Sequence, residues 1–342
     1  MGKPNGTAHN VIEDILQKHE IMVLDGAMAT ELERHGCDLN DALWSAQVLL
    51  SQPELIYQVH LDYYRAGADC ATTSSYQATV DGFRKRGFSE EEALKLIKST
   101  VELARKARDE YWEQEVAGAA DGDQVGNGAS EQAASTRDAK SVSRPKPLVA
   151  ASIGPYGAYL ADGSEYVGNY GVSDEVLTEF HRPRMAAVIE AGADLLAFET
   201  VPSLQEARVL DALLKEFPGV YAWLSFSLKN ETAISEGTPL AECAAAFADS
   251  EQIAAIGMNC APGAVVTEAI KVLRAHSQKP IIVYPNSGES YNPETKTWHG
   301  EGSCPSFLEE AEGWYEAGAR IIGGCCRTSP QQIEAVARKW RA

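Results

Sequence analysis

The 342-residue sequence lacks any apolar run of the roughly 18–20 residues that cross a lipid bilayer, and its first residues (MGKPNGTAHN) lack the apolar core of a secretion signal. Basic residues are also scarce, because 30 Lys and Arg stand against 49 Asp and Glu and leave a formal net charge of −19. Nucleic acids and anionic membranes both require a basic surface, so we expect neither as a partner.

Cysteine is present but lacks the even number and regular spacing of a disulfide framework, since the chain has seven. We therefore expect reduced thiols and a cytoplasmic location. Several catalytic motifs are missing as well: no G-x-G-x-x-G follows the first predicted strand, and there is no Walker sequence, no H-E-x-x-H and no hydrolase order of Ser, His and Asp. These absences argue against a nucleotide-binding fold and against the commonest hydrolases.

What is present is a regular alternation of short apolar runs with segments of helical spacing. The eight runs are Ile21–Leu24, Cys70–Ser74, Leu148–Ser152, Leu195–Glu199, Ala222–Phe226, Ile253–Met258, Ile281–Tyr284 and Arg320–Gly323. Several are apolar throughout, as in parallel strands covered on both faces. The pattern predicts an α/β fold, a (β/α)8 TIM-type barrel forming a single domain over residues 1–342. A doubly wound sheet is the alternative, and the missing phosphate loop counts against it.

A repeated tetrad supports the alternation. Ala-Gly-Ala-Asp occurs at Ala66–Asp69 and Ala191–Asp194, and Ala317–Arg320 repeats it with Arg last. In each copy the Gly stands where a helix must end in a left-handed turn before the next strand. We therefore expect three equivalent junctions between a helix and a strand.

One stretch interrupts the pattern after the second barrel helix, which we predict over Ser89–Tyr111. Residues 117–146 contain no Leu, Ile, Phe, Tyr or Trp. Such a segment cannot bury enough apolar surface to offset the entropy of ordering it. We expect a disordered surface insert; a linker between two domains is the alternative.

In a barrel the reacting groups belong at the carboxyl ends of the strands. Cys260 follows the sixth run, and the adjacent Cys325 and Cys326 follow the eighth, after two glycines. Three thiols converging there suit Zn²⁺, and the fourth position would stay open as in a catalytic site. A strained vicinal disulfide and unmetallated packing cysteines remain the alternatives.

Two acidic residues, Asp25 and Glu199, also close apolar runs. Helix caps or salt-bridge partners are the ordinary roles for such residues. At one barrel mouth, however, they could hold an ammonium group, while the backbone N–H groups of Gly26 to Met28 could hold a carboxylate. Together these groups would bind an amino acid.

The chain resembles the homocysteine S-methyltransferase family, most closely its S-methylmethionine-dependent branch. The resembling segments are LDGAMATEL (24–32), LWSA (43–46), HLDYYRAGAD (60–69), SYQAT (75–79), GPYGAYLADGSEY (154–166), FET (198–200), NC (259–260), YPNSGE (284–289) and IGGCCRT (322–328). The resemblance implies a zinc ion held by Cys260, Cys325 and Cys326, with the homocysteine thiol as fourth ligand. It implies an amino-acid pocket at Asp25, Gly26, Ala27, Met28 and Glu199, and it places Tyr76 and Asn286 near the donor or the bound amino acid.

The implied reaction moves a methyl group from a sulfonium donor to homocysteine and forms methionine. Coordination to zinc deprotonates a thiol, and a sulfonium loses its charge as the methyl leaves, so no general acid is needed. S-adenosylmethionine remains open as the donor, and selenocysteine or selenohomocysteine as the acceptor. A dithiol redox protein, a metal-binding barrel and a catalytically inactive binding barrel are the other hypotheses. A monomer is the expected state.

Overall fold

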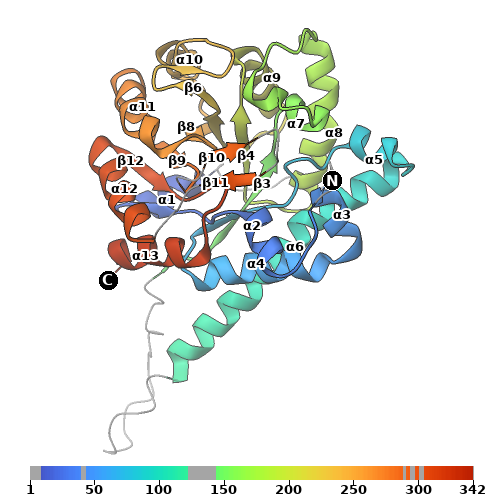
Figure 1. The fold of residues 1–342 in the computed structure, drawn as a ribbon. Coiled ribbons are helices and arrows are strands. Elements are labelled where there is room, and N and C mark those ends of the chain that lie inside the picture. Colours follow the sequence, from blue (N-terminus) through green and yellow to red (C-terminus); the bar gives the residue numbers. More distant parts are fainter. Residues whose placement is uncertain are drawn as a thin grey trace, which may run out of the picture.

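The computed structural model describes residues 9–39, 44–121, 144–287, 290–292, 297–299 and 304–341. Its central feature is a sheet of eight parallel strands in the order β1-β12-β9-β8-β5-β4-β3-β2 (Figure 1). The strands are β1 (Met22–Val23), β2 (Cys70–Thr72), β3 (Leu148–Ile153), β4 (Leu195–Val201), β5 (Ala222–Phe226), β8 (Ile253–Asn259), β9 (Ile281–Tyr284) and β12 (Ala319–Ile322). A parallel bridge between Leu24 and Cys70 joins β1 to β2 and closes the ring. The predicted barrel fold is confirmed, and each predicted run supplies one barrel strand.

Helices surround this barrel. The eight that lead from one barrel strand towards the next, or end the chain, are α4 (Pro53–Arg65), α6 (Glu90–Asp121), α8 (Asp174–Glu190), α9 (Leu204–Leu214), α10 (Leu240–Ala246), α11 (Gly263–His276), α12 (Cys304–Ala317) and α13 (Pro330–Arg341). The other helices are α1 (Val11–Leu16), α2 (Met28–Arg34), α3 (Trp44–Ser51), α5 (Val80–Lys85), α7 (Tyr156–Leu160) and the 3-10 turn η2 (Ser164–Tyr166). Among the described residues, no helix is both long and apolar enough to cross a membrane.

Local sequence explains where these helices begin. Ser89 and Glu92 form a capping box before α6: the Ser89 amide donates to the Glu92 carboxylate at 2.8 Å, and the Glu92 amide donates to Ser89 Oγ at 3.2 Å. At α8 the hydroxyl oxygen of Ser173 caps the helix by accepting a hydrogen bond from the Val176 amide. Two hairpins, β6 (Leu228–Asn230) with β7 (Ala233–Ile234) and β10 (Ser290–Asn292) with β11 (Thr297–His299), were not expected from the sequence.

The repeated tetrad marks equivalent junctions, as predicted. Gly67, Gly192 and Gly318 have φ angles of +102°, +86° and +122°, the left-handed conformation that favours glycine. The structure also explains the tetrad's last residue. Asp69 accepts a hydrogen bond from the Val23 amide at 2.8 Å, and Asp194 accepts one from the Val149 amide at 2.7 Å. Each aspartate therefore fastens its own strand to a neighbouring strand.

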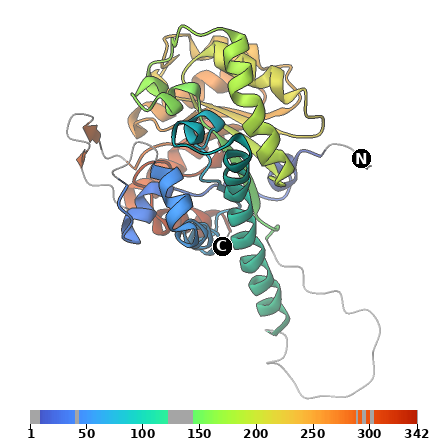
Figure 2. The same cartoon turned by 90° about the vertical axis from the view of Figure 1, so that its right-hand side faces the viewer.

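The helix α6 extends further than predicted. It continues to Asp121 instead of ending at Tyr111, so the first residues of the predicted insert are helical. Tyr111 is buried and its hydroxyl accepts a hydrogen bond from Arg144 at 2.8 Å, whereas residues 113–117 are exposed. The last turns of α6 point away from the barrel (Figure 2). Residues 122–143, which make up most of the predicted insert, lie outside the described residues.

Replacing residues 118–142 by a Gly/Ser linker of about eight residues should leave activity unchanged and the melting temperature within about 3 °C. The linker reaches from the end of the exposed turns to Arg144, because an extended chain spans about 3.3–3.6 Å per residue. Loop closure also depends only weakly on loop length. Thermal unfolding and turnover of the two proteins are the measurements. A larger loss of stability would show that the replaced residues are part of the folded domain.

Candidate active site

Three cysteines meet at the carboxyl ends of two barrel strands. Cys260 directly follows β8, while Cys325 and Cys326 come shortly after β12. Only β9 separates these strands in the sheet, so their ends lie at one part of the rim. The three sulfur atoms lie within 4.8 Å of one another, and those of Cys260 and Cys326 are 3.8 Å apart. The sequence correctly predicted this convergence; the cysteines' role as ligands stays a prediction.

The donor set and its spacing fit a zinc ion. Zinc bound tetrahedrally by sulfur at about 2.3 Å places neighbouring sulfurs about 3.8 Å apart. The pKa of Cys326 lies well below its usual range because the thiols of Cys260 and Cys325 donate hydrogen bonds to its sulfur. Among the described residues, no fourth thiol, imidazole or carboxylate joins the group. A metal held here would keep a coordination position for a substrate.

The two glycines before the vicinal cysteines are required by close packing. A Cβ atom on Gly324 would lie 2.3 Å from the hydroxyl oxygen of Thr328, and one on Gly323 would lie 2.5 Å from Cβ of Leu24. The turn is further fixed because the Cys325 amide donates to the Pro285 carbonyl at 2.8 Å. This backbone lies so close to β1 and β9 that only glycine fits beside the thiols.

Backbone strain is concentrated at the same rim. Cys260 and Thr200 have φ angles of +50° and +57°, which cost side-chain-bearing residues on the order of 1 kcal/mol or more. Asn259 holds both segments in place: its side chain accepts from the Thr200 amide and donates to the Thr200 hydroxyl, each at 2.7 Å. Asn259 lies in the matching NC segment but was not predicted to have this role.

Asp25 and Glu199 are both almost completely buried near this cluster. The Thr72 amide donates to Asp25 at 2.7 Å; Ser152 Oγ donates to Glu199, and the Tyr284 hydroxyl does so at 3.2 Å. Burial raises the pKa of Asp25 to about 8 and that of Glu199 to about 7. Within the described chain neither forms an ion pair with Lys or Arg. The site thus offers two buried carboxyl groups that have no cationic partner among the described residues.

The end of one strand and the turn after another differ slightly from the prediction. Glu199 lies inside β4, which continues to Val201, instead of ending it. In the turn from Gly26 to Met28, the Ala27 amide already donates to the Thr328 carbonyl at 3.3 Å. A ligand carboxylate at this turn would therefore depend on Gly26 and Met28.

Tyr76 and Asn286, predicted near the donor or the bound amino acid, also lie at the mouth. The ring of Tyr76 packs against Gly154, where a Cβ would come within 2.6 Å of the ring. Burial raises the pKa of Tyr76, and negative charge on Glu165 and Cys260 raises it further, so its phenol faces these groups. The side-chain oxygen of Asn286 is buried and lacks a hydrogen-bond partner among the described residues. It is free to meet a bound molecule.

Sequence reasoning missed the groups that orient the two carboxylates. Ser152 lies near the end of β3 and Tyr284 ends β9, so the strand-end rule could have singled out both. Glu165 and Tyr166, in η2, were missed because they are far from any strand end. The only signal for these two residues was their place in the matching segment 154–166.

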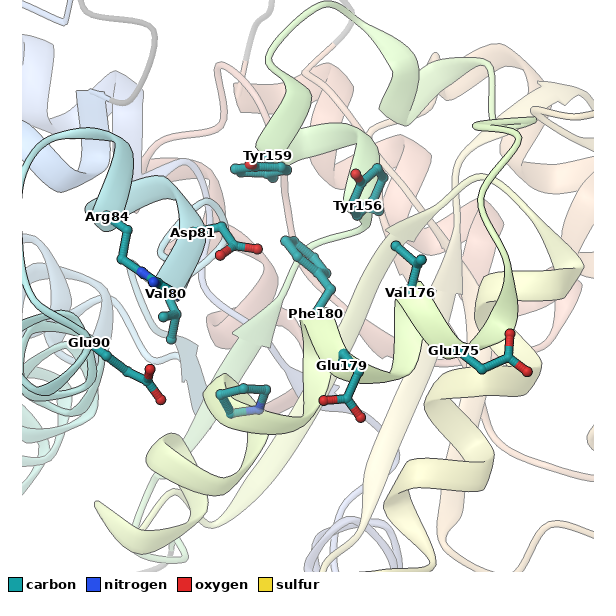
Figure 3. A pocket seen from close by; sticks show the side chains of 11 residues that line it. Val80, Asp81, Arg84, Glu90, Tyr156, Tyr159, Glu175, Val176, Glu179 and Phe180 are labelled. Atoms are coloured by element: carbon teal, nitrogen blue, oxygen red, sulfur yellow. The ribbon is translucent and has the colours of Figure 1, made fainter.

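A cavity of about 460 Å³ opens on the outside of the barrel between α5, α7 and α8. Figure 3 shows the rings of Tyr156, Tyr159 and Phe180 gathered on one side of it, with carboxylates such as Asp81 and Glu179 around them. It is lined by none of the cysteines. The three thiols of the rim are therefore separate from this cavity.

Comparisons with known proteins agree with this geometry. The family described as Homocysteine S-methyltransferase matches residues 22–340. Homocysteine S-methyltransferase YbgG of Bacillus subtilis is 55% identical over 328 residues, which cover 96% of this chain and 97% of the relative. The metallated form of the homocysteine methyltransferase MmuM from Escherichia coli is a similar structure with a TM-score of 0.80 and 45% identity, covering 96% of this chain and 100% of that one. A selenocysteine Se-methyltransferase of Brassica oleracea var. italica is 42% identical over 327 residues, 93% of this chain and 88% of the relative.

Proposed function

The chain belongs to the homocysteine S-methyltransferase family, and from this premise we propose that it transfers a methyl group from a sulfonium donor to the thiol of homocysteine, forming methionine. The observation that carries the proposal is the trio of sulfurs within 4.8 Å of one another, at a rim that also holds two buried carboxylates without a cationic partner.

Cys260, Cys325 and Cys326 are the residues that would hold the metal, which we infer to be zinc. The sulfur spacing and the metallated state of the similar Escherichia coli structure support this inference. Zinc, when bound, keeps an acceptor sulfur as thiolate at neutral pH, where a free thiol with a pKa near 8.5 is mostly protonated. No side chain then has to act as a general base.

The acceptor's ammonium group is assigned to Asp25 and Glu199. Thr72, Ser152 and Tyr284 orient these carboxylates and leave acceptor capacity on their oxygens. A cation brought by the ligand stabilises the ionised carboxylates, which burial alone disfavours. Gly26 and Met28 are the proposed backbone contacts of the acceptor's carboxylate, beside the engaged Ala27.

The protein's remaining task is alignment. The acceptor sulfur provides the electron pair for the new S–C bond, and the donor sulfur leaves as a neutral thioether with the pair of the broken bond. Because the leaving group carries no charge, it needs no proton from the enzyme. Holding sulfur, methyl and sulfur in line is a proximity effect, and the rigid strained ends at Thr200 and Cys260 support it. Tyr76 and Asn286 border the same space.

S-methylmethionine is our proposed donor and homocysteine our proposed acceptor. S-adenosylmethionine presents the same sulfonium methyl, and selenocysteine differs from homocysteine by one methylene and one chalcogen, which a pocket separates by only about 1–3 kcal/mol. The Bacillus subtilis relative, described as acting on homocysteine, is more similar to this chain than the selenocysteine enzyme of Brassica. The relative rates at which homocysteine and selenocysteine are methylated in one reaction mixture decide which acceptor the enzyme prefers.

Purified, reduced protein should contain about one zinc ion per chain and should form methionine from S-methylmethionine and homocysteine. Chelation should remove zinc and turnover together, and added zinc should restore both. Metal analysis and product chromatography are the measurements. Fresh reduced protein that lacks zinc yet turns over, or that shows only reversible oxidation of two thiols, would contradict the proposal and favour a redox role.

A further inference from the structure

The segment Tyr156–Tyr166, which comprises α7 and η2, follows β3, and its last residue lies beside the thiol cluster. The Tyr166 hydroxyl is within hydrogen-bonding reach of the Cys260 sulfur. Negative charge on Cys260 raises the pKa of Tyr166 well above its usual range, so the phenol lies close to that sulfur. Half of the Tyr166 side chain is nevertheless exposed, at 50%. This ring therefore stands between the sulfurs and the outside.

Glu165 brings a third carboxylate to the same space. One of its oxygens, Oε2, is buried and lacks a hydrogen-bond partner among the described residues. Burial raises the pKa of Glu165, and charges on Asp162 and Cys260 raise it further. A buried carboxylate oxygen without a partner is unfavourable, and an incoming cation that donates a hydrogen bond to it removes that cost. The acceptor pocket at Asp25 and Glu199 does not use Glu165.

The backbone of this segment is held firmly. A Cβ on Gly157 would lie 2.4 Å from the Glu165 nitrogen, so α7 and η2 pack with no room between them. Ser227 Oγ donates to the Glu165 carbonyl at 3.0 Å, and η2 packs against β4, the strand of Glu199. The inward direction of the Glu165 side chain is thus a property of the fold.

A sulfonium amino acid carries two cationic centres, the sulfonium sulfur and the α-ammonium. The sulfonium must reach the acceptor sulfur, and aromatic faces attract such a cation. The ring of Tyr166 borders the thiol cluster, and that of Tyr76 lies near both Glu165 and Cys260. The α-ammonium lies only a few bonds from the sulfonium in the donor, so it needs a carboxylate close to the ring that contacts the sulfonium. Glu165 meets that need, because it is next to Tyr166 in the chain and also lies near Cys260.

We propose that Glu165 and Tyr166 form the methyl-donor subsite: the orphaned oxygen of Glu165 accepts a hydrogen bond from the α-ammonium of a sulfonium amino acid, and the ring of Tyr166 lies against its sulfonium. This inference rests on the proposed function. In the transfer, the C–S bond of the donor breaks, its electron pair stays on the donor sulfur, the acceptor sulfur bonds the methyl, and the acceptor's thiol proton goes to solvent.

The test compares Glu165→Gln with Asp162→Asn. Asp162 is an exposed carboxylate three residues away that accepts from the Ser164 amide at 3.0 Å, a bond that asparagine keeps. Glu165→Gln should raise the KM for S-methylmethionine at least tenfold and leave the KM for homocysteine and the zinc content unchanged. Asp162→Asn should change none of these. Dimethylsulfoniopropionate, a sulfonium without an α-ammonium, should react equally well with wild type and Glu165→Gln.

A second variant addresses the ring: Tyr166→Phe should keep the donor KM within about twofold, whereas Tyr166→Leu should raise it. An unchanged donor KM in Glu165→Gln, or a raised homocysteine KM instead, would overturn the assignment. Calorimetric titration of S-methylmethionine into zinc-loaded wild type and Glu165→Gln makes the same comparison without turnover. A wild type that transfers no methyl group would refute the proposed function, while the titration still tests the subsite.

Discussion

Replacing Cys326 by serine is expected to remove most of the bound zinc and to lower activity by more than about a hundredfold, because a hydroxyl is a far poorer ligand than a thiolate. The sulfur of Cys326 lies 3.8 Å from that of Cys260, and hydrogen bonds from Cys260 and Cys325 lower the pKa of its thiol. Zinc content and the rate of methionine formation are the measurements, made on the same preparation.

Cys243→Ser is the matched control. Cys243 is completely buried in α10, and burial raises its pKa to about 12, which marks an inert thiol. This change should cost on the order of 1 kcal/mol of stability and leave zinc and turnover intact. If Cys326→Ser kept its full zinc and rate, the three-cysteine site would be wrong. If both variants lost zinc, the effect of Cys326→Ser would be loss of folding instead of loss of a ligand.

The barrel and the thiol cluster could be predicted because both follow from one regularity. Parallel strands covered on both faces are apolar runs, and their carboxyl ends must share a rim. Cys260 and Cys325 are 65 positions apart in the chain, yet counting strands is enough to place them together. The repeated tetrad predicted its three junctions for a similar reason, because a glycine between a helix and a strand usually takes the left-handed conformation that ends the helix.

The strand-end rule points to Ser152 and Tyr284 one by one, but their pairing with Glu199 could not be predicted, because these residues come from strands that are distant in sequence and meet only inside the barrel. Tyr284 on β9 reaches Glu199 on β4 across the barrel interior, and nothing local in either strand indicates the pair. The strained φ of Cys260 is likewise imposed by tertiary bonds around Asn259. The end of α6 was placed too early because the sequence after Tyr111 loses its apolar spacing, although its Glu and Ala residues favour a helix.

Glu199→Gln should raise the KM for homocysteine by about 10- to 150-fold, which corresponds to the 1.5–3 kcal/mol of a charge-assisted hydrogen bond. Glutamine keeps the size of the side chain and one acceptor oxygen. The Tyr284 hydroxyl can turn its hydrogen to Ser225, whose Oγ lies 2.5 Å away, and then accept from the new amide. The rise in KM should therefore reflect the missing negative charge and not a disrupted barrel interior. Steady-state kinetics with homocysteine as the varied substrate is the measurement.

Glu31→Gln is a suitable control, because Glu31 is also buried but pairs with Arg34 on α2, at 2.6 Å. It should leave the acceptor KM unchanged. An acceptor analogue without the amino group should bind wild type poorly and be insensitive to Glu199→Gln. Unchanged homocysteine affinity in Glu199→Gln would defeat the ammonium assignment.

The rival role for Glu199, a general base for the acceptor's thiol proton, gives the opposite pH behaviour. A pKa raised to about 7 means that the carboxyl is protonated below that pH. As an ammonium anchor it therefore weakens acceptor binding as the pH falls through 7, and Glu199→Gln removes this dependence while its KM stays high at every pH. As a general base, its loss would leave the acceptor KM intact and depress kcat at neutral pH, with recovery as the pH approaches the free-thiol pKa near 8.5. We expect the first pattern, because a metal held by the three cysteines already deprotonates the thiol.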